Sequence, residues 1–427
     1  MSTHDKKKKK AGDWGIAFYL AVRQLKHASL WTTSLIVAVM MLTFLNLVVV
    51  NGILVGLIES SIQASKDKYS GDVIISTLRQ KAIIENSEEI EEILKSLPNV
   101  TDVVPRVLAG GKVQAEYRKL LRQEETPNEA QVTVAGIDPL LEDKATGLSK
   151  YVIDGTYLDD ADREGILVGA FLLNELTPID NAGFPQLRGV KIGDRVKLTV
   201  DKNSKEVFVR GILKSKIDQI DARVFMVQPE LRKLIGRSDV NVSEIAVRLT
   251  PGSTEADAVR VKNILESNGY EYDAKIQTAT EAQPKFLKDM KDLFGLLGTL
   301  MGSIGLVVAS ITIFIVIFVN TLTRRKFIGI LKGIGISSKS IEYSYIIQSA
   351  FYAIAGAGVG MLVLYGFLVP FIDAHPINFP FSDGILYAPL GGTMLRVLAL
   401  FITTIVAGYI PARMIVGKNT LDSILGR

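Results

Sequence analysis

Side chains that could do chemistry are few and scattered in this 427-residue sequence. Gly-Lys pairs, which end a phosphate-binding loop, occur at Gly111-Lys112 and Gly417-Lys418, where a valine and an asparagine follow. Such a loop has the form G-x-x-x-x-G-K-[ST], so neither pair completes it. The sequence also lacks the zinc-protease pattern H-E-x-x-H and the hydrolase pattern G-x-S-x-G. We therefore predict that the chain is not an enzyme and that it has no catalytic residue.

Metal and nucleic-acid chemistry are disfavoured as well. The sequence has no cysteine, which excludes disulfides and thiolate ligands, and its three histidines, His4, His27 and His375, are far apart. We predict no metal site and no cofactor bound by this chain. The net charge of +4 is mild, and no basic stripe is interleaved with aromatic residues, so we expect no nucleic-acid partner.

The hydrophobic residues, 48% of the chain, are concentrated near its two ends. A membrane-spanning helix needs about 20 apolar residues. Runs of this kind predict four spans at residues 30–58, 293–322, 343–372 and 394–412, the third including the start of an outer loop. The first run is much longer than the apolar core of a signal peptide, so we expect it to be retained.

The basic residues orient these spans. Short loops rich in lysine and arginine stay in the cytoplasm. Residues 1–13, which include the run Lys6–Lys10, are predicted to be a disordered tail. Residues 14–29 are predicted to form a basic amphipathic helix. The loop at 323–342 and the end at 413–427 are also basic, whereas the loop at 373–393 has no lysine or arginine. Both termini are therefore predicted to be cytoplasmic.

Residues 59–292 are then extracytoplasmic, and their polar, mixed sequence predicts an α+β domain. Helical ends at 59–69 and 285–292 would form a stalk, and a subdomain at about 110–240 is a possible insertion. Short Val/Ile-rich segments predict strands at 72–76, 101–108, 112–117, 131–136, 165–168, 195–200, 206–213, 223–227, 244–249 and 272–277. Helices are predicted at 87–97, 170–176, 229–235 and 254–267. The fold class is an α-helical membrane protein with four spans and a large extracytoplasmic α+β domain inserted between the first two.

The basic segment from Arg324 to Ser340 has two interpretations. Its charges alone would serve as a topology anchor on the cytoplasmic side. Its apolar residues are expected to face apolar surroundings and are not needed for an anchor, so they favour a docking helix for a cytoplasmic partner: Phe327, Ile328, Ile330, Leu331, Ile334 and Ile336.

Polar and small residues inside the spans suggest helix contacts. Asn46 and Asn51 lie in the first span and Gly298-x-x-x-Gly302 at the start of the second, and they are candidates for a dimer interface or a substrate-facing surface. The third span carries a further small-residue pattern, Gly356-x-x-x-Gly360. The spans contain no Asp, Glu, His or Lys, which disfavours proton-coupled transport.

The basic segment also resembles a motif of a known family. The motif residues are Arg324, Arg325, Lys326, Phe327, Ile328, Gly329, Ile330, Leu331, Lys332 and Gly335. They are similar to the element after the second span in permease subunits of ABC transporters of the MacB/FtsX/LolC-E type. Pro411-Ala412-Arg413 and residues 421–425 resemble the family's C-terminus, although Thr420 stands where many members have proline.

The resemblance implies a subunit without a fused ATPase in a bacterial inner membrane. It implies a separate ATPase in two copies, which binds ATP and Mg²⁺ and docks on the 323–342 hairpin, and a second permease, identical or paralogous. Membrane lipid and an extracytoplasmic accessory or cargo protein are further implied partners. ATPase motion would then be transmitted to the outer domain to extrude or release a lipophilic, lipoprotein or peptide cargo. The alternative is a regulatory permease that activates a cell-wall hydrolase and transports nothing.

Overall fold

The computed structural model describes residues 3–119, 126–176, 185–378 and 383–417, which divide into two compact units. The membrane unit contains Met1–Glu59, Asp289–Asn378 and Asp383–Arg427, and the outer unit consists mainly of Ser60–Lys288. Four helices among the described residues are long and apolar enough to cross a membrane. The predicted fold class, four spans with an α+β domain between the first two, is confirmed.

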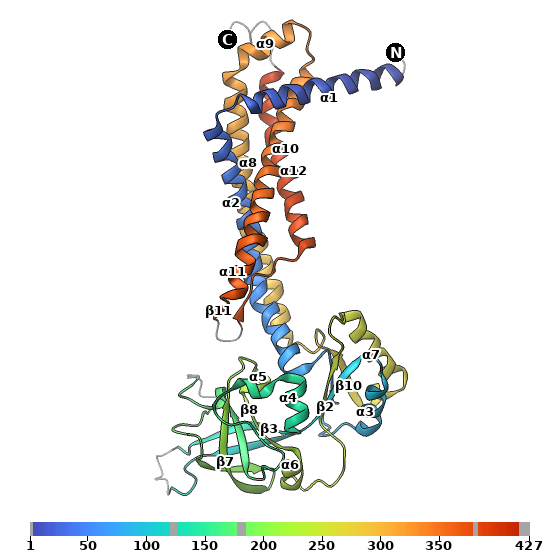
Figure 1. Ribbon diagram of the computed structural model, residues 1–427, viewed down its shortest axis with the longest axis vertical. Helices are drawn as coiled ribbons and strands as arrows, with labels where there is room; N and C mark the ends of the chain where they lie inside the picture. Colours follow the sequence, from blue (N-terminus) through green and yellow to red (C-terminus); the bar gives the residue numbers. More distant parts are fainter. Residues whose placement is uncertain (1–2, 120–125, 177–184, 379–382, 418–427) are drawn as a thin grey trace. The chain divides into compact units, whose positions relative to one another are not determined.

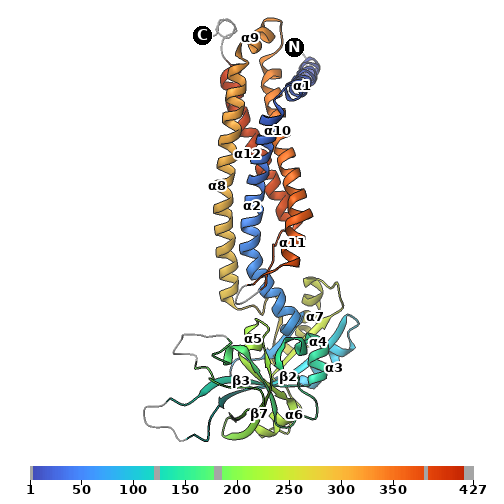
Figure 2. The same ribbon diagram turned by 60° about the vertical axis from the view of Figure 1, so that its left-hand side comes forward.

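Long helices lie side by side in the membrane unit (Figures 1 and 2). They are α2 (Leu30–Ser65), α8 (Lys285–Thr323), α10 (Ser338–Val363) and α12 (Leu390–Val416). The short helix α9 (Arg325–Gly333) joins α8 to α10 at the end of the bundle that α1 (Thr3–Lys26) crosses. At the other end, α10 continues through a wider turn (Leu364–Leu368) into α11 (Val369–Ala374), and β11 (Ile377–Asn378) pairs with β12 (Asp383–Gly384).

Two helix boundaries differ from the predictions. The tail expected to be disordered through residue 13 is helical from Thr3, because Lys and Ala favour helix and the segment continues into the amphipathic helix. The fourth span is predicted to end at residue 412, one residue after Pro411, but α12 continues to Val416. Proline is tolerated in membrane helices where neighbouring groups satisfy the backbone carbonyl it frees.

Small residues bring the membrane helices together. A Cβ added at Gly356 would lie 2.3 Å from Met40, and one at Gly360 would lie 2.3 Å from Phe44, so α10 contacts α2 along this face. A Cβ at Gly408 would similarly lie 1.9 Å from the hydroxyl of Ser349, where α12 meets α10. The close-packing face predicted for Gly356-x-x-x-Gly360 is confirmed.

An extended strap, residues 383–389, runs from β12 to α12 and crosses α2. The backbone N–H of Tyr387 donates a hydrogen bond of 3.1 Å to the carbonyl of Gly52. A Cβ at Gly56 would lie only 2.1 Å from the carbonyl oxygen of Ile385. Glycine at both positions therefore lets an extended chain lie directly on the helix backbone.

The outer unit is built on a mixed ten-stranded sheet (Figure 1). The strand order is β10-β1-β9-β2-β3-β8-β5-β7-β4, and β6 pairs with β2 and β7. The strands are β1 (Val73–Thr77), β2 (Val100–Gln114), β3 (Glu129–Ile137), β4 (Val152–Gly155), β5 (Gly165–Gly169), β6 (Arg195–Val200), β7 (Asn203–Leu213), β8 (Arg223–Val227), β9 (Glu244–Leu249) and β10 (Ala274–Thr278). The helices of seven or more residues are α3 (Ser87–Ser96), α4 (Pro139–Thr146), α6 (Gln228–Leu234) and α7 (Glu255–Ser267).

Strand β2 belongs to both halves of this sheet. Its first part pairs with β9 up to Arg106↔Glu244, and its second part pairs with β3 from Val107 onward. We had predicted two strands, 101–108 and 112–117, separated at Gly110-Gly111, and this was wrong. Gly111 instead lies inside the strand, where a Cβ would come within 2.9 Å of the Thr199 carbonyl, so it allows close approach of β6 rather than a break.

Candidate functional site

Helix α9, in the motif that the sequence singles out, has two apolar faces. Ile328 and Leu331 are 2% and 7% exposed and pack into the core of the membrane unit. Phe327, Ile330 and Ile334 are 48%, 54% and 71% exposed. Residues three and four positions apart share one face of a helix, so these three form a single stripe. We call it the exposed stripe.

Contacts from two other elements hold α9 in place. The ammonium of Lys332 donates a hydrogen bond to the carbonyl of Val416 at the end of α12. After α9 the chain turns at Gly335, whose φ of +94° lies in the left-handed region that glycine tolerates. Ser337 then caps α10, its hydroxyl accepting a 3.1 Å hydrogen bond from the N–H of Ser340. These contacts hold the hairpin against the C-terminal end of α12 and the N-terminal end of α10.

Helix α1 packs against the start of α10. The carboxylate of Asp13 accepts hydrogen bonds from Ser337 (2.6 Å) and Ser340 (2.7 Å). The ring of Trp14 stacks on Tyr343 with centroids 4.8 Å apart. Asp13 and Trp14 of α1 therefore contact the end of the hairpin and the start of α10 directly.

A groove of about 430 Å³ lies between α1 and the hairpin. Of the residues whose side chains the structure describes, eleven line it and none of these is acidic: Gly15, Ile16, Tyr19, Leu20, Arg23, Gln24, His27, Arg324, Phe327, Leu331 and Ile336. Sequence reasoning did not find this groove, because it forms only when two segments about 300 residues apart meet.

The structure places the other motif residues on different surfaces. Arg324 and Arg325 are half-buried, Lys326 is exposed, and Gly329 is buried with Ile328 and Leu331. Pro411 and Ala412 are buried, whereas Arg413 is exposed and donates a 3.3 Å hydrogen bond to the Tyr409 hydroxyl. Thr420, Lys418, Arg427 and residues 421–425 lie outside the described residues. The exposed members of the motif are Lys326, Phe327, Ile330 and Gly335, and Ile334 completes the exposed stripe beside them.

The candidates within the spans are engaged inside this one chain. A Cβ at Gly298 would lie 2.3 Å from the amide of Asn51, and one at Gly302 would lie 3.2 Å from Leu47. The predicted close contact at this glycine pair is confirmed, and α2 of the same chain makes it. Asn51 accepts a 2.8 Å hydrogen bond from Arg396 of α12, and Asn46 is exposed.

The outer unit contains a buried ionic network that the sequence did not reveal. Arg106, fully buried in β2, donates hydrogen bonds to Glu142 (2.7 Å), to Glu244 (2.8 Å) and to the Tyr69 carbonyl (2.9 Å). The Tyr69 hydroxyl in turn bonds to Glu244 and Arg223. Burial alone would lower the pKa of Arg106, but Glu142, Tyr69 and Glu244 raise it well above its usual value. Burial raises the pKa of Tyr69. The network therefore holds a fixed charge inside the domain.

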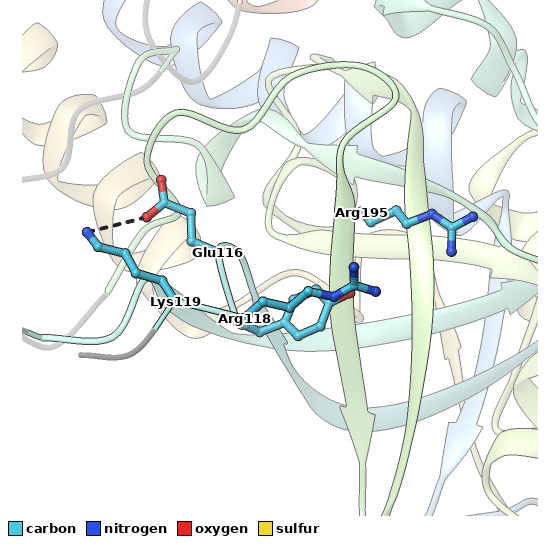
Figure 3. A pocket seen from close by; sticks show the side chains of 5 residues that line it. Glu116, Arg118, Lys119 and Arg195 are labelled. Carbon is cyan, nitrogen blue, oxygen red and sulfur yellow. Dashed lines mark ion pairs between the residues drawn. The ribbon is translucent and has the colours of Figure 1, made fainter.

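Another cluster of charges on the outer unit is compensated internally. A surface hollow of about 330 Å³ is lined by charged side chains, which Figure 3 shows as sticks: Glu116, Arg118, Lys119 and Arg195. Lys119 pairs with Glu116 (3.9 Å), and both Arg118 (2.9 Å) and Arg195 (3.7 Å) pair with Glu206. Within the described parts of the chain, no group of three or more histidine or acidic side chains could hold a metal ion.

Together, four spans, a mixed-sheet domain between the first two and a basic hairpin after the second define a membrane permease. The family described as "MacB-like periplasmic core domain" matches residues 30–263, more than half of the chain. The family described as "FtsX-like permease C-terminal" matches residues 299–420. The chain belongs to the FtsX-like and MacB-like family of ABC transporter permeases.

Two curated relatives are also permeases. The chain is 24% identical over 277 residues to the uncharacterized ABC transporter permease MJ1507 of Methanocaldococcus jannaschii, covering 64% of this chain and 65% of that one. It is 28% identical over 178 residues to the ABC transporter permease YtrF of Bacillus subtilis, covering 39% of each chain. The matched region therefore spans less than two thirds of either relative.

Two solved structures also share similarity with the chain. The periplasmic region of MacB from Actinobacillus actinomycetemcomitans has a TM-score of 0.33 at 13% identity, covering 49% of this chain and 90% of that one. The extracellular domain of the transporter YknZ from Gram-positive bacteria has a TM-score of 0.30 at 14% identity, covering 48% of this chain and 98% of that one.

Proposed function

We propose that this chain is the permease subunit of an ATP-driven transporter, and that a separate cytoplasmic ATPase docks on the exposed stripe of α9. The single observation that carries the proposal is that α9 buries Ile328 and Leu331 in its own bundle yet leaves Phe327, Ile330 and Ile334 uncovered. An apolar helix face at a membrane surface, rimmed by basic residues, suits a partner helix groove with acidic rims. The ATPase would supply ATP and Mg²⁺.

Charge supports the orientation that this proposal needs. The hairpin and both chain ends are rich in lysine and arginine, whereas residues 373–393, which include the strap, have none. The hairpin and termini would therefore lie in the cytoplasm and the outer unit on the other side of a bacterial inner membrane. A second permease, identical or paralogous, would complete the transporter.

The outer unit is the proposed receiver of ATP-driven motion. Glu59 of α2 and Lys291 of α8 form an ion pair of 2.7 Å near the points where both helices reach the outer unit. Motion of the hairpin would pass along α8 and change this pairing. The proposed result is extrusion or release of a lipophilic, lipoprotein or peptide cargo at the outer leaflet.

The test is co-purification of the ATPase from native membranes with the variant Ile330→Asp. Because Ile330 is exposed, the change leaves the bundle core untouched, and a charged residue at the centre of an interface should lower recovery of the ATPase by at least about tenfold. Leu140→Asp is the matched control, since Leu140 is 70% exposed on the outer unit. We expect Leu140→Asp to recover the ATPase fully.

Three outcomes distinguish the proposed transporter from the regulatory permease. Loss in Ile330→Asp alone supports docking on α9. If no ATPase accompanies the unaltered protein, the proposal is wrong. If an ATPase docks but the outer unit retains a cell-wall hydrolase and no cargo, the regulatory permease replaces the transporter.

A further inference from the structure

We propose that the groove between α1 and the hairpin is a binding site for one anionic phospholipid of the leaflet at that end of the bundle. The inference rests on the membrane location of the chain and does not require the ATPase. It concerns defined side chains and is separate from any diffuse attraction of the Lys6–Lys10 run to the membrane.

The first argument is charge. Arg23 and Arg324 come from opposite walls of the groove, and His27 adds a further nitrogen donor. No lining residue is acidic, and neither guanidinium has an ion-pair partner among the residues the structure describes. A phosphate diester would supply the missing negative charge and accept bidentate hydrogen bonds from arginine.

The second argument is the apolar lining. Ile16, Tyr19, Leu20, Phe327, Leu331 and Ile336 form most of the wall. A site for a soluble anion would not need this surface, whereas the glycerol backbone and first acyl carbons of a lipid would bury it. A volume of about 430 Å³ lies in the range of small-ligand sites and accommodates a headgroup, with the acyl tails left in the bilayer.

The third argument is position along the chain. Arg324 directly follows Thr323, the last residue of α8, and His27 lies three residues before α2 begins at Leu30. Both therefore stand at the ends of spans, where headgroups lie. Aromatic side chains exposed nearby on α1 and α2, Trp14, Phe18, Tyr19 and Trp31, are typical of that boundary. These features favour a lipid over a free phosphate.

A bound lipid would bridge α1 and the hairpin. Phe327 lines the groove and also belongs to the exposed stripe, so the lipid would fix the side chain that begins the docking face. The lipid composition of the leaflet would then set how firmly the hairpin is held.

The experiment is native mass spectrometry of the full chain in neutral detergent. Phosphatidylglycerol and phosphatidylcholine with identical acyl chains are titrated separately. We expect one phosphatidylglycerol to bind at least about fivefold more tightly than phosphatidylcholine, since each cation near a headgroup contributes about that factor. Arg23→Gln and Arg324→Gln should each weaken phosphatidylglycerol binding about three- to fivefold, and should weaken phosphatidylcholine binding less, because the choline cation offsets the charge of its phosphate.

Lys26→Gln is the matched control. Lys26 is an exposed cation on the same helix, three residues from Arg23, and does not line the groove. We expect it to change neither lipid's affinity. Because Arg23 is exposed, Arg23→Gln should fold normally, and a thermal melting curve in phosphatidylcholine checks this. If Arg324→Gln proves unstable, Arg23→Gln alone tests the proposal.

Three results would overturn the proposal. Equal affinity for the two lipids would remove the role of headgroup charge. Equal losses in Lys26→Gln and Arg23→Gln would indicate diffuse surface attraction. Displacement of phosphatidylglycerol by millimolar inorganic phosphate would assign the groove to a soluble anion.

Discussion

At the scale of single residues, Arg106 shows which partners a buried charge requires. Its guanidinium is bound by two carboxylates and a backbone carbonyl, and it lies over the ring of Tyr69 at 4.2 Å. A charge with no access to water is tolerated only with such partners. Arg106 thus commits β2, β9 and α4 to one arrangement.

We expect Arg106→Met to destabilise the outer unit by about 3–5 kcal/mol, because Glu142 and Glu244 would remain buried without a cation. Chemical unfolding of the full chain in detergent measures the change. Arg118→Met, which removes an exposed arginine paired with Glu206, is the control and should change little. A stable Arg106→Met variant would show that water reaches the network.

The carboxylate of Asp239 should contribute to the pH dependence of the unfolding free energy in acid. A hydrogen bond from Arg237 lowers the pKa of Asp239 from 3.8 to about 2. Since the folded pKa is below the unfolded one, the stabilisation is present above about pH 4 and is lost as pH falls towards about 2. Asp239→Asn should lack this part of the acid dependence in unfolding titrations. Asp160→Asn, at an exposed carboxylate with no ion pair among the described residues, should retain it.

At the scale of elements, the strap across α2 is the least tolerant contact of the membrane unit. The backbone of Ile385 lies where a Cβ of residue 56 would be, and backbone cannot rotate away as a side chain can. A larger residue there must displace the whole segment 383–389.

We expect Gly56→Ala to destabilise the protein by about 1–3 kcal/mol and to make residues 383–389 accessible to protease. Gly358→Ala is the control, because nothing lies within 4 Å of a Cβ at that position in α10. Thermal unfolding and limited proteolysis in detergent measure both effects. Equal behaviour of the two variants would contradict the tight strap contact.

Sequence periodicity predicted most elements, and its failures have physical reasons. Strands β6, β8 and β9 match the predicted ranges because alternating or continuous Val/Ile runs end at turn residues. β4 (Val152–Gly155) was missed because three of its four residues are exposed. α4 was missed although Asp138 caps it and Pro139 begins it, since it carries no clear apolar periodicity. The predicted helix 170–176 shrinks to a 3₁₀ turn at Ala170–Leu172.

The candidate site was predictable only in part. The motif around α9 was visible in the sequence, and so was its apolar character. The sequence did not show which of these residues face outward, because that depends on the core of the membrane unit, into which Ile328 and Leu331 pack together with Ala412 and Val416 of α12. Arg23 could not be linked to Arg324 without the three-dimensional contact between α1 and the hairpin.

At the scale of the whole molecule, the proposed transmission of motion requires α2 and α8 to move relative to each other. The chain has no cysteine, so introduced cysteines are unique attachment points. In the variant with Glu59→Cys and Lys291→Cys, a short bismaleimide would join α2 to α8. We expect the assembled transporter to continue to hydrolyse ATP, while cargo release falls by at least about tenfold. A loss of that size is what a small misplacement of coupled groups can cause.

The control joins Asp289→Cys to Asp292→Cys, two positions on the same face of α8. This link has the same chemistry but restrains only one helix, so cargo release should persist. Full release in the Glu59–Lys291 cross-linked protein would show that motion reaches the outer unit by another route.

Strand β2 also has a consequence for how the family could diversify. The chain leaves the first half of the sheet after Arg106 and returns at Glu244, and these two residues are direct partners across antiparallel strands. A tight two-residue turn could join such neighbours. Everything between them could therefore be gained or lost in one genetic event without disturbing the pairing of β1, β9 and β10. A shorter homologue that closes this hairpin directly would lose Glu142 and Arg223, together with the part of the shared hydrophobic core that residues 107–243 supply, and would need apolar replacements only on that side of the remaining strands.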